Sequence, residues 1–236
     1  MTEALPFPIR LRGEGNSTNT AAAIVLVRMN ANQFHLGLRH GPPPAELVLH
    51  LGWHRSLRDQ PLAELTRHKQ KTLPAAVVVL SLDPLIDGAL QFLATRVGER
   101  HADALVYGFG EEDAVFETTT AELTDPDAAF TCATFVLALL ASVGVHLVDA
   151  ARWRAPTPQD TEWQRTIGET LLTHIEAYFP GDLPRAKERV ERDIGSRRYR
   201  PTDVAGAALL AREKRPAGAE DVEPIARKFE CVLHAL

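Results

Sequence analysis

The sequence predicts an α+β fold in which an antiparallel sheet packs on a helix and further helices follow. Three observations support this class. Short apolar runs rich in β-branched residues recur before residue 110. Residues 130–148 have the composition of a buried helix followed by a short strand. Beyond residue 156 the pattern becomes that of amphipathic and charged helices. We therefore expect one domain over residues 1–155 and a helical extension over residues 156–236.

The strands are predicted from apolar runs and from the alternation of apolar and polar residues. Residues 21–29, "AAAIVLVRM", are typical of a strand, and residues 33–40, "QFHLGLRH", alternate like its hairpin partner. Residues 45–57 are expected to form a third strand. The uninterrupted apolar run at 75–82 predicts a buried strand, and residues 103–110 predict a further short one.

Helices are predicted where a capping residue precedes an apolar side. Asp83 can cap a helix that has Pro84 at its first position. Thr131, or a nearby aspartate, can cap a second helix that begins at about Cys132 and ends near Gly144. Further helical stretches are expected at residues 157–179, 182–195, 200–214 and 224–236, and residues 214–228 have the composition of a linker or weakly ordered segment.

The composition excludes several classes of function. A net charge of -5 gives no electrostatic reason to expect nucleic acid or an anionic membrane as a partner. The apolar run at 130–148 is interrupted by polar residues and by glycine, so we expect no membrane span. The N-terminus lacks a basic start followed by an apolar block, and two cysteines form no disulfide framework. These features favour a cytoplasmic protein with reduced thiols, without a cofactor, and leave its oligomeric state open.

Cys132 is the candidate nucleophile because of its place at the start of a helix. The unpaired N–H groups and the helix dipole at that end favour negative charge, so we expect a lowered thiol pKa. The same N–H groups can bind an oxyanion that forms on a substrate carbonyl. The alternative is that Cys132 is a buried core residue, which is common for a free cysteine.

Two histidines, His50 and His54, are the candidate bases. They lie four positions apart on the strand predicted at 45–57, so they share one face with Gly52 between them. The alternative is that this strand face is exposed to solvent and that the two histidines have no catalytic role. Their separation of roughly 13 Å along a strand makes a shared metal ion unfavourable. His35 and His40 on the adjacent hairpin strand could add metal ligands, but no ligand spacing repeats and no zinc pattern stands out. His50 is preferred to His54 as the base because it lies deeper in the strand.

The order of these residues resembles a known family. A histidine-bearing strand, a long gap and then "CATFV" opening an apolar helix look like the circularly permuted NlpC/P60 branch of the papain-like thiol hydrolases. The segment "CATFVLALLASVG" is similar to the small-residue cysteine helix of that family, and "VYGFG" is similar to its upstream tyrosine-glycine segment. The resemblance covers about residues 24–150. It implies a papain-like fold and places Tyr107 near the thiol, where it could bind substrate or oxyanion.

The function that this resemblance implies is that of a cysteine hydrolase without a metal. Cys132 and His50 would cleave a peptide, isopeptide or other amide bond through a thioester intermediate. An acyltransferase or thioesterase that uses the same dyad is one alternative. An inactive papain-like binding module is another, and the sequence does not name the substrate. Ser81, His101 and Asp103 are all candidates for the third residue that would orient the imidazole.

Other notable residues favour structural roles. Trp153 and Trp163 flank a predicted helix start and are expected to pack there rather than to bind a partner. Residues 185–201 are locally basic, but acidic residues interleave, so a solvated helix face is expected. Cys231 lies in the last predicted helix and is expected to be a core residue or a bystander.

Overall fold

The centre of the fold is a six-stranded sheet in which all neighbouring strands are antiparallel. The computed structural model describes residues 9–11, 21–42, 44–68, 71–110, 113–210 and 212–236. The strand order is β1-β8-β2-β3-β4-β5. These strands are β1 (Ile9–Leu11), β2 (Ala23–Asn30), β3 (Gln33–His40), β4 (Leu47–Trp53), β5 (Ser56–Gln60) and β8 (Ala75–Val79).

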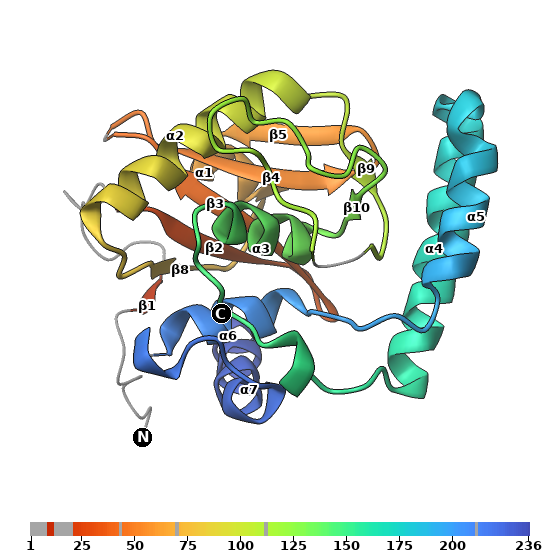
Figure 1. The fold of residues 1–236 in the computed structure, drawn as a ribbon. Helices are drawn as coiled ribbons and strands as arrows, with labels where there is room; N and C mark the ends of the chain where they lie inside the picture. Colours follow the sequence, from red (N-terminus) through yellow and green to blue (C-terminus); the bar gives the residue numbers. More distant parts are fainter. Residues whose placement is uncertain (1–8, 12–20, 43, 69–70, 111–112, 211) are drawn as a thin grey trace.

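The longer helices pack on one face of this sheet or stand beside it (Figure 1), and two short strand pairs form separate small sheets. The helices are α1 (Leu62–Leu65), α2 (Pro84–His101), α3 (Cys132–Ser142), α4 (Pro158–Tyr178), α5 (Leu183–Asp193), α6 (Pro201–Leu209) and α7 (Ala219–Ala235). The strands β6 (Arg67–His68) and β7 (Lys71–Thr72) pair antiparallel, whereas β9 (Val106–Tyr107) and β10 (Ala129–Phe130) pair parallel. The α+β class with an antiparallel sheet is therefore confirmed.

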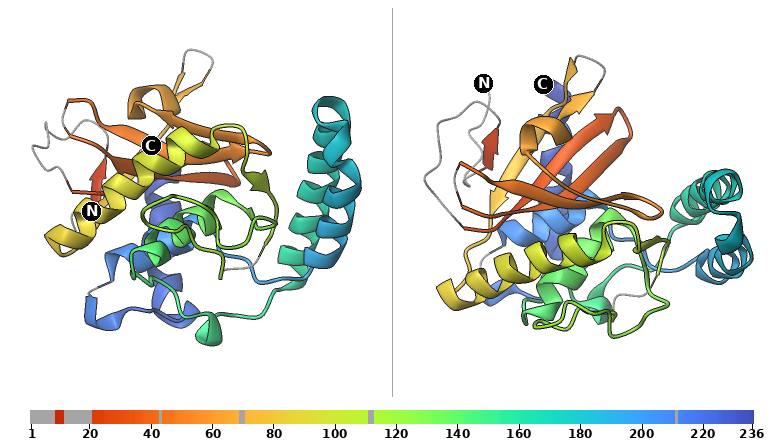
Figure 2. Two further views of the ribbon diagram at one scale, coloured as in Figure 1. Left: turned by 45° about the horizontal axis from the view of Figure 1, so that its top comes forward. Right: turned by 90° about the horizontal axis from the view of Figure 1, so that it is seen from above.

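The main core lies between one face of the sheet and the helices α2, α3 and α6 (Figures 1 and 2). Leu36 and Leu38 of β3 and Leu49 and Leu51 of β4 point to this face and are fully buried. Alternate residues of the same strands point to the other face, where a smaller cluster is built around valines. Within the described residues, no helix is long and apolar enough to cross a membrane.

The C-terminal segment contains two different structures. Helices α4 and α5 contact each other as an antiparallel pair that stands beside the sheet (Figures 1 and 2). Helix α6 instead contacts β2, β3 and β8, and its Val204 and Ala205 belong to the main core. Residues 194–200 connect the two parts, and we call them the strap.

Several predicted helix and strand starts are confirmed. The β2–β3 hairpin forms, with its turn at residues 31–32. Asp83 caps α2, accepting a hydrogen bond from the backbone N–H of Leu85. Thr131 caps α3, and Gly144 just beyond that helix has φ +76°, the left-handed conformation that glycine adopts without strain.

Three other predictions are wrong. Residues 45–57 are not one strand, because the chain turns back at His54 and Arg55, where Arg55 has a φ of +51°. Residues 214–228 are not a linker throughout, since α7 begins at Ala219 and Asp221 accepts the N–H of Gly218 at its start. The basic stretch at 185–201 is not one helix face, because α5 ends at Asp193 and the strap follows.

Candidate active site

Cys132 is the first residue of α3 and lies at the edge of the main core. Thr131 caps the helix, and its side chain and that of Thr134 bind each other's backbone N–H groups in a capping box. This fixes the first turn of α3 and therefore the position of the thiol. Cys132 is only 8% exposed, but it lines a cavity of about 500 Å³. The start of α3 is thus both buried and open to a ligand-sized space.

The thiol lies where β3 and β4 separate. These strands pair from Leu38 to His40 on β3, but the residues of β3 before Gly37 have no partner on β4. The backbone N–H groups of Leu36 and Ala133 lie near the sulfur of Cys132 and lower the pKa of its thiol against the larger effect of burial. Beside this opening, His35, Trp53 and Cys132 all line the same cavity.

His35 and His50 form a hydrogen-bonded pair on the face of the sheet opposite α3. His35 immediately precedes Leu36 on β3, and its Nε2 lies 2.8 Å from Nδ1 of His50 on β4. The two rings meet edge to face with their centroids 4.8 Å apart. Gly37 allows this approach, because a Cβ there would lie 2.6 Å from Cγ1 of Val48 and 3.1 Å from Cβ of His50.

Burial keeps both the histidines and the thiol neutral. It lowers the pKa of His35 to about 4, and with the charges of His35 and Arg58 it lowers the pKa of His50 to about 3. Burial also raises the pKa of the Cys132 thiol to about 11. The expected lowering of that pKa at a helix start is therefore wrong, because desolvation outweighs the N–H groups that face the sulfur.

The histidine favoured from the sequence and its alternative occupy different places. His50 is 6% exposed and bonds His35, while its Nε2 is buried without a hydrogen-bond partner. His54 lies in the β4–β5 turn and bonds Asp182 at 3.1 Å, on the side of the α4–α5 pair. Among the described residues, no hydrogen bond joins Cys132 to a histidine. Cys132 and His35 thus line the same cavity, whereas His50 and His54 are not among the residues that line it.

The structure places Tyr107 in the same cavity as Cys132. Its ring packs on Trp53 with centroids 4.5 Å apart, and burial, reinforced by Cys132, raises the pKa of its hydroxyl. The three candidates for an orienting residue lie elsewhere. Ser81 lines a separate cavity, His101 bonds the carbonyl of Ala121, and Asp103 is exposed.

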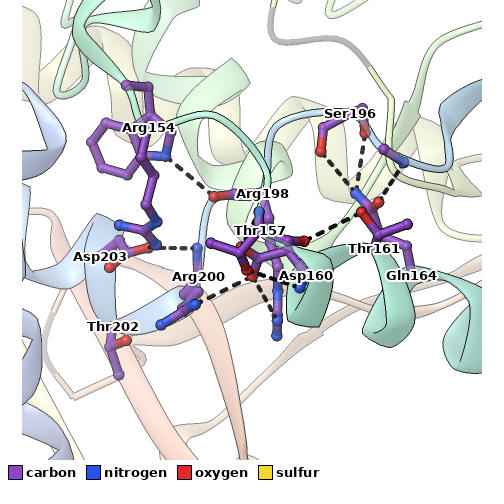
Figure 3. Close-up of polar contacts among 12 residues, drawn as sticks. Arg154, Thr157, Asp160, Thr161, Gln164, Ser196, Arg198, Arg200, Thr202 and Asp203 are labelled. Atoms are coloured by element: carbon purple, nitrogen blue, oxygen red, sulfur yellow. Dashed lines mark hydrogen bonds and ion pairs between the residues drawn. The ribbon is translucent and has the colours of Figure 1, made fainter.

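The far wall of the cavity comes from α4 and the strap, and the sequence did not reveal it. Figure 3 shows how the two are joined. Gln164 of α4 donates to the carbonyl of Ser196 at 3.0 Å and accepts the N–H of Gly195 at 2.7 Å. Asp160, which is 1% exposed, accepts hydrogen bonds from Arg198 and Arg200, both at 3.2 Å.

Trp163 and Trp153 differ in their surroundings. Trp153 is buried against Tyr199, in agreement with a packing role. Trp163 is half-buried and lines the cavity, with the guanidinium of Arg198 stacked 3.7 Å from its ring centroid. The exposed Cys231 is not a core residue.

Comparisons with known proteins do not assign a function to this site. Comparisons of the chain with protein-family models, with curated proteins and with solved structures give no match. Among the residues that the structure describes, no three or more His, Cys, Asp or Glu side chains gather in a way that could hold a metal ion. The function must therefore be argued from the cavity itself.

Proposed function

We propose that this chain is a cysteine hydrolase that cleaves an acyl bond, with Cys132 as nucleophile, His35 as base and His50 as the residue that orients His35. One observation carries the proposal. Cys132 at a helix start and His35 line the same cavity, and His35 is itself bonded to His50. A nucleophile, a base and a third group that orients the base are the parts that covalent acyl transfer needs.

This assignment moves the role of base from His50 to His35. A hydrogen bond from Nε2–H of His35 to Nδ1 of His50 leaves the lone pair of His35 on its Nδ1. In the proposed reaction that nitrogen accepts the thiol proton after His35 turns into the cavity that both residues line, because its side chain otherwise lies on the sheet face opposite α3. His50 takes the orienting role for which the sequence had suggested Ser81, His101 or Asp103.

The mechanism starts from a neutral thiol and a neutral imidazole, because of the pKa values that burial imposes. As the sulfur attacks the carbonyl carbon, His35 takes its proton, and the N–H groups at the start of α3 bind the oxyanion. Collapse of this intermediate breaks the acyl bond, and His35 returns the proton to the leaving group. Water, deprotonated by His35, then cleaves the thioester and regenerates the thiol.

The resemblance to permuted NlpC/P60 proteins supports Cys132 as nucleophile and a histidine that precedes it in the chain, although it had suggested His50 or His54 and not His35 as the base. It favours a peptide, isopeptide or other amide bond, and an acyl ester in its lipid-acting members. An acyltransferase follows the same path, with another nucleophile in place of water.

Hydrolysis of a chromogenic acyl ester or anilide series tests the proposal. We expect Cys132→Ser to abolish turnover and His35→Gln to lower kcat/KM by about 10²–10⁴-fold. Cys231→Ser is the matched control for the loss of a thiol. A loss in His54→Gln that equals the loss in His35→Gln would contradict the assignment of the base.

A second candidate function is a non-catalytic binding module with this fold. The raised pKa of the Cys132 thiol favours it, because few molecules carry the reactive thiolate at neutral pH. Turnover that depends on Cys132 excludes this candidate.

A further inference from the structure

The cavity beside Cys132 has an excess of positive charge on one wall. Among the described residues, the charged side chains that line it, apart from histidine, are Arg197, Arg198, Arg200 and Glu230. Glu230 of α7 accepts a hydrogen bond from Thr202 at 3.1 Å. Three arginines and one glutamate therefore line a space that the nucleophile also lines.

Asp160 compensates only part of this charge. Although its burial raises the pKa of its carboxyl, hydrogen bonds from Thr157 and the charge of Arg200 bring it to about 2, so Asp160 is ionised. Its Oδ1 is shared by Arg198 and Arg200, one bond to each (Figure 3). Asp203 is a second carboxyl whose charge acts on both arginines, but it accepts the backbone N–H of Arg200 and the guanidinium of Arg154. Among the described residues, Nε of Arg200 is buried without a hydrogen-bond partner.

The orientation of Arg198 suits it to bind an anion. One face of its guanidinium is covered by the indole of Trp163, which fixes the plane of the group. Stacking occupies one face of the guanidinium and leaves the N–H donors at its edge available to a planar anion. The charge also reaches the reaction centre, since Arg198 lowers the pKa of the Cys132 thiol against the larger effect of burial.

We propose that Arg198 and Arg200 form an anion subsite, so that the preferred substrate carries a carboxylate or a phosphate next to the acyl bond that Cys132 attacks. The inference rests on the proposed function and gives its substrate class. The apolar side chains of Phe34, Phe109 and Ile167 line the remaining cavity and suit the uncharged part of such a substrate.

Two alkylating reagents of the same size test this subsite without a known substrate. Iodoacetate carries a carboxylate where iodoacetamide carries a neutral amide, and each reacts when the thiolate displaces iodide from carbon. Labelling rates would be measured at Cys132 and at the exposed Cys231 by peptide mass mapping on the full chain. We expect the iodoacetate-to-iodoacetamide ratio to be about tenfold higher at Cys132 than at Cys231.

Substitutions and added salt test whether the arginines cause the preference of Cys132 for iodoacetate. Arg198→Gln should reduce the ratio at Cys132 to that at Cys231. Arg165→Gln is the matched control, because it removes the same charge from an exposed site on α4 outside the cavity. Sodium chloride should lower the iodoacetate rate at Cys132 of the unaltered protein, a measurement that does not depend on the folding of any variant.

Competing anions separate the two sources of negative charge. Protection of Cys132 by acetate at constant ionic strength assigns a carboxylate, and protection by inorganic phosphate assigns a phosphate. If neither anion protects Cys132 but iodoacetate still reacts preferentially, the subsite binds a carboxylate only when it is attached to the reacting group.

The outcomes also separate this inference from the proposed function. Equal reagent ratios at Cys132 and Cys231, with both thiols reactive, overturn the anion subsite alone. Failure of native Cys132 to react with either reagent, while Cys231 reacts, overturns the nucleophile and the subsite together.

Discussion

The buried pair His35–His50 should make the stability of the fold depend on pH. In the unfolded chain His35 has a pKa of 6.5, and burial lowers this pKa to about 4 in the folded protein. The unfolded state therefore binds more protons between these values. Stability is complete above pH 6.5 and is lost as the pH falls toward 4. For His35 alone the shift corresponds to about 3 kcal/mol of unfolding free energy.

Urea unfolding between pH 7.5 and 4.5 measures this loss against variants. His35→Gln removes the titrating group, so its unfolding free energy should fall less steeply, by about 1.4 kcal/mol per pH unit within the window. The exposed His146→Gln controls for the removal of one imidazole. Identical slopes for the unaltered protein and His35→Gln would refute the argument, because His35 would then take up its proton in the folded state.

Two further substitutions, Gly37→Ala with its control Gly88→Ala and Asp160→Ala, test the packing around the site. Gly37→Ala should lower the unfolding free energy by about 1–3 kcal/mol, because the new Cβ meets Val48 and His50. Gly88→Ala on α2, where a Cβ meets nothing within 4 Å, should raise it by about 0.5–1 kcal/mol, and urea unfolding that showed equal effects would contradict this steric argument. Asp160→Ala should cost about 3–5 kcal/mol, since it leaves two arginines without their buried carboxylate. A thermal or urea midpoint unchanged from the unaltered protein would show that the strap does not depend on Asp160.

The local structure of the core could be predicted from the sequence because its signals are short-range. The alternation in residues 33–40 predicts β3, and the polar residues Asp83 and Thr131 cap α2 and α3 as expected. The break at Arg55 was missed, because a non-glycine residue adopts the left-handed conformation there and gives no glycine signal. That turn moves His54 away from the face that it would otherwise share with His50.

Which residues meet at the site depends on long-range contacts, so it could not be predicted from local sequence patterns. The pairing of His35 with His50 requires the register of β3 against β4, which is set across the loop between them and not by either strand alone. The alternation of both strands was nevertheless a usable signal, since it puts both histidines on one face. The arginines of the strap reach Cys132 only because the chain returns past α4, and no local pattern encodes that return.

Detection of an acyl-enzyme is the most direct test of the claim that Cys132 is a nucleophile and His35 its base. The protein would be mixed with p-nitrophenyl acetate, quenched at short times and analysed by intact mass and peptide mapping. We expect a burst of p-nitrophenol with the acetyl group on Cys132, no burst in Cys132→Ser and a much slower burst in His35→Gln. Acetylation at Cys231 or at lysines alone, at a rate that neither substitution changes, would contradict it.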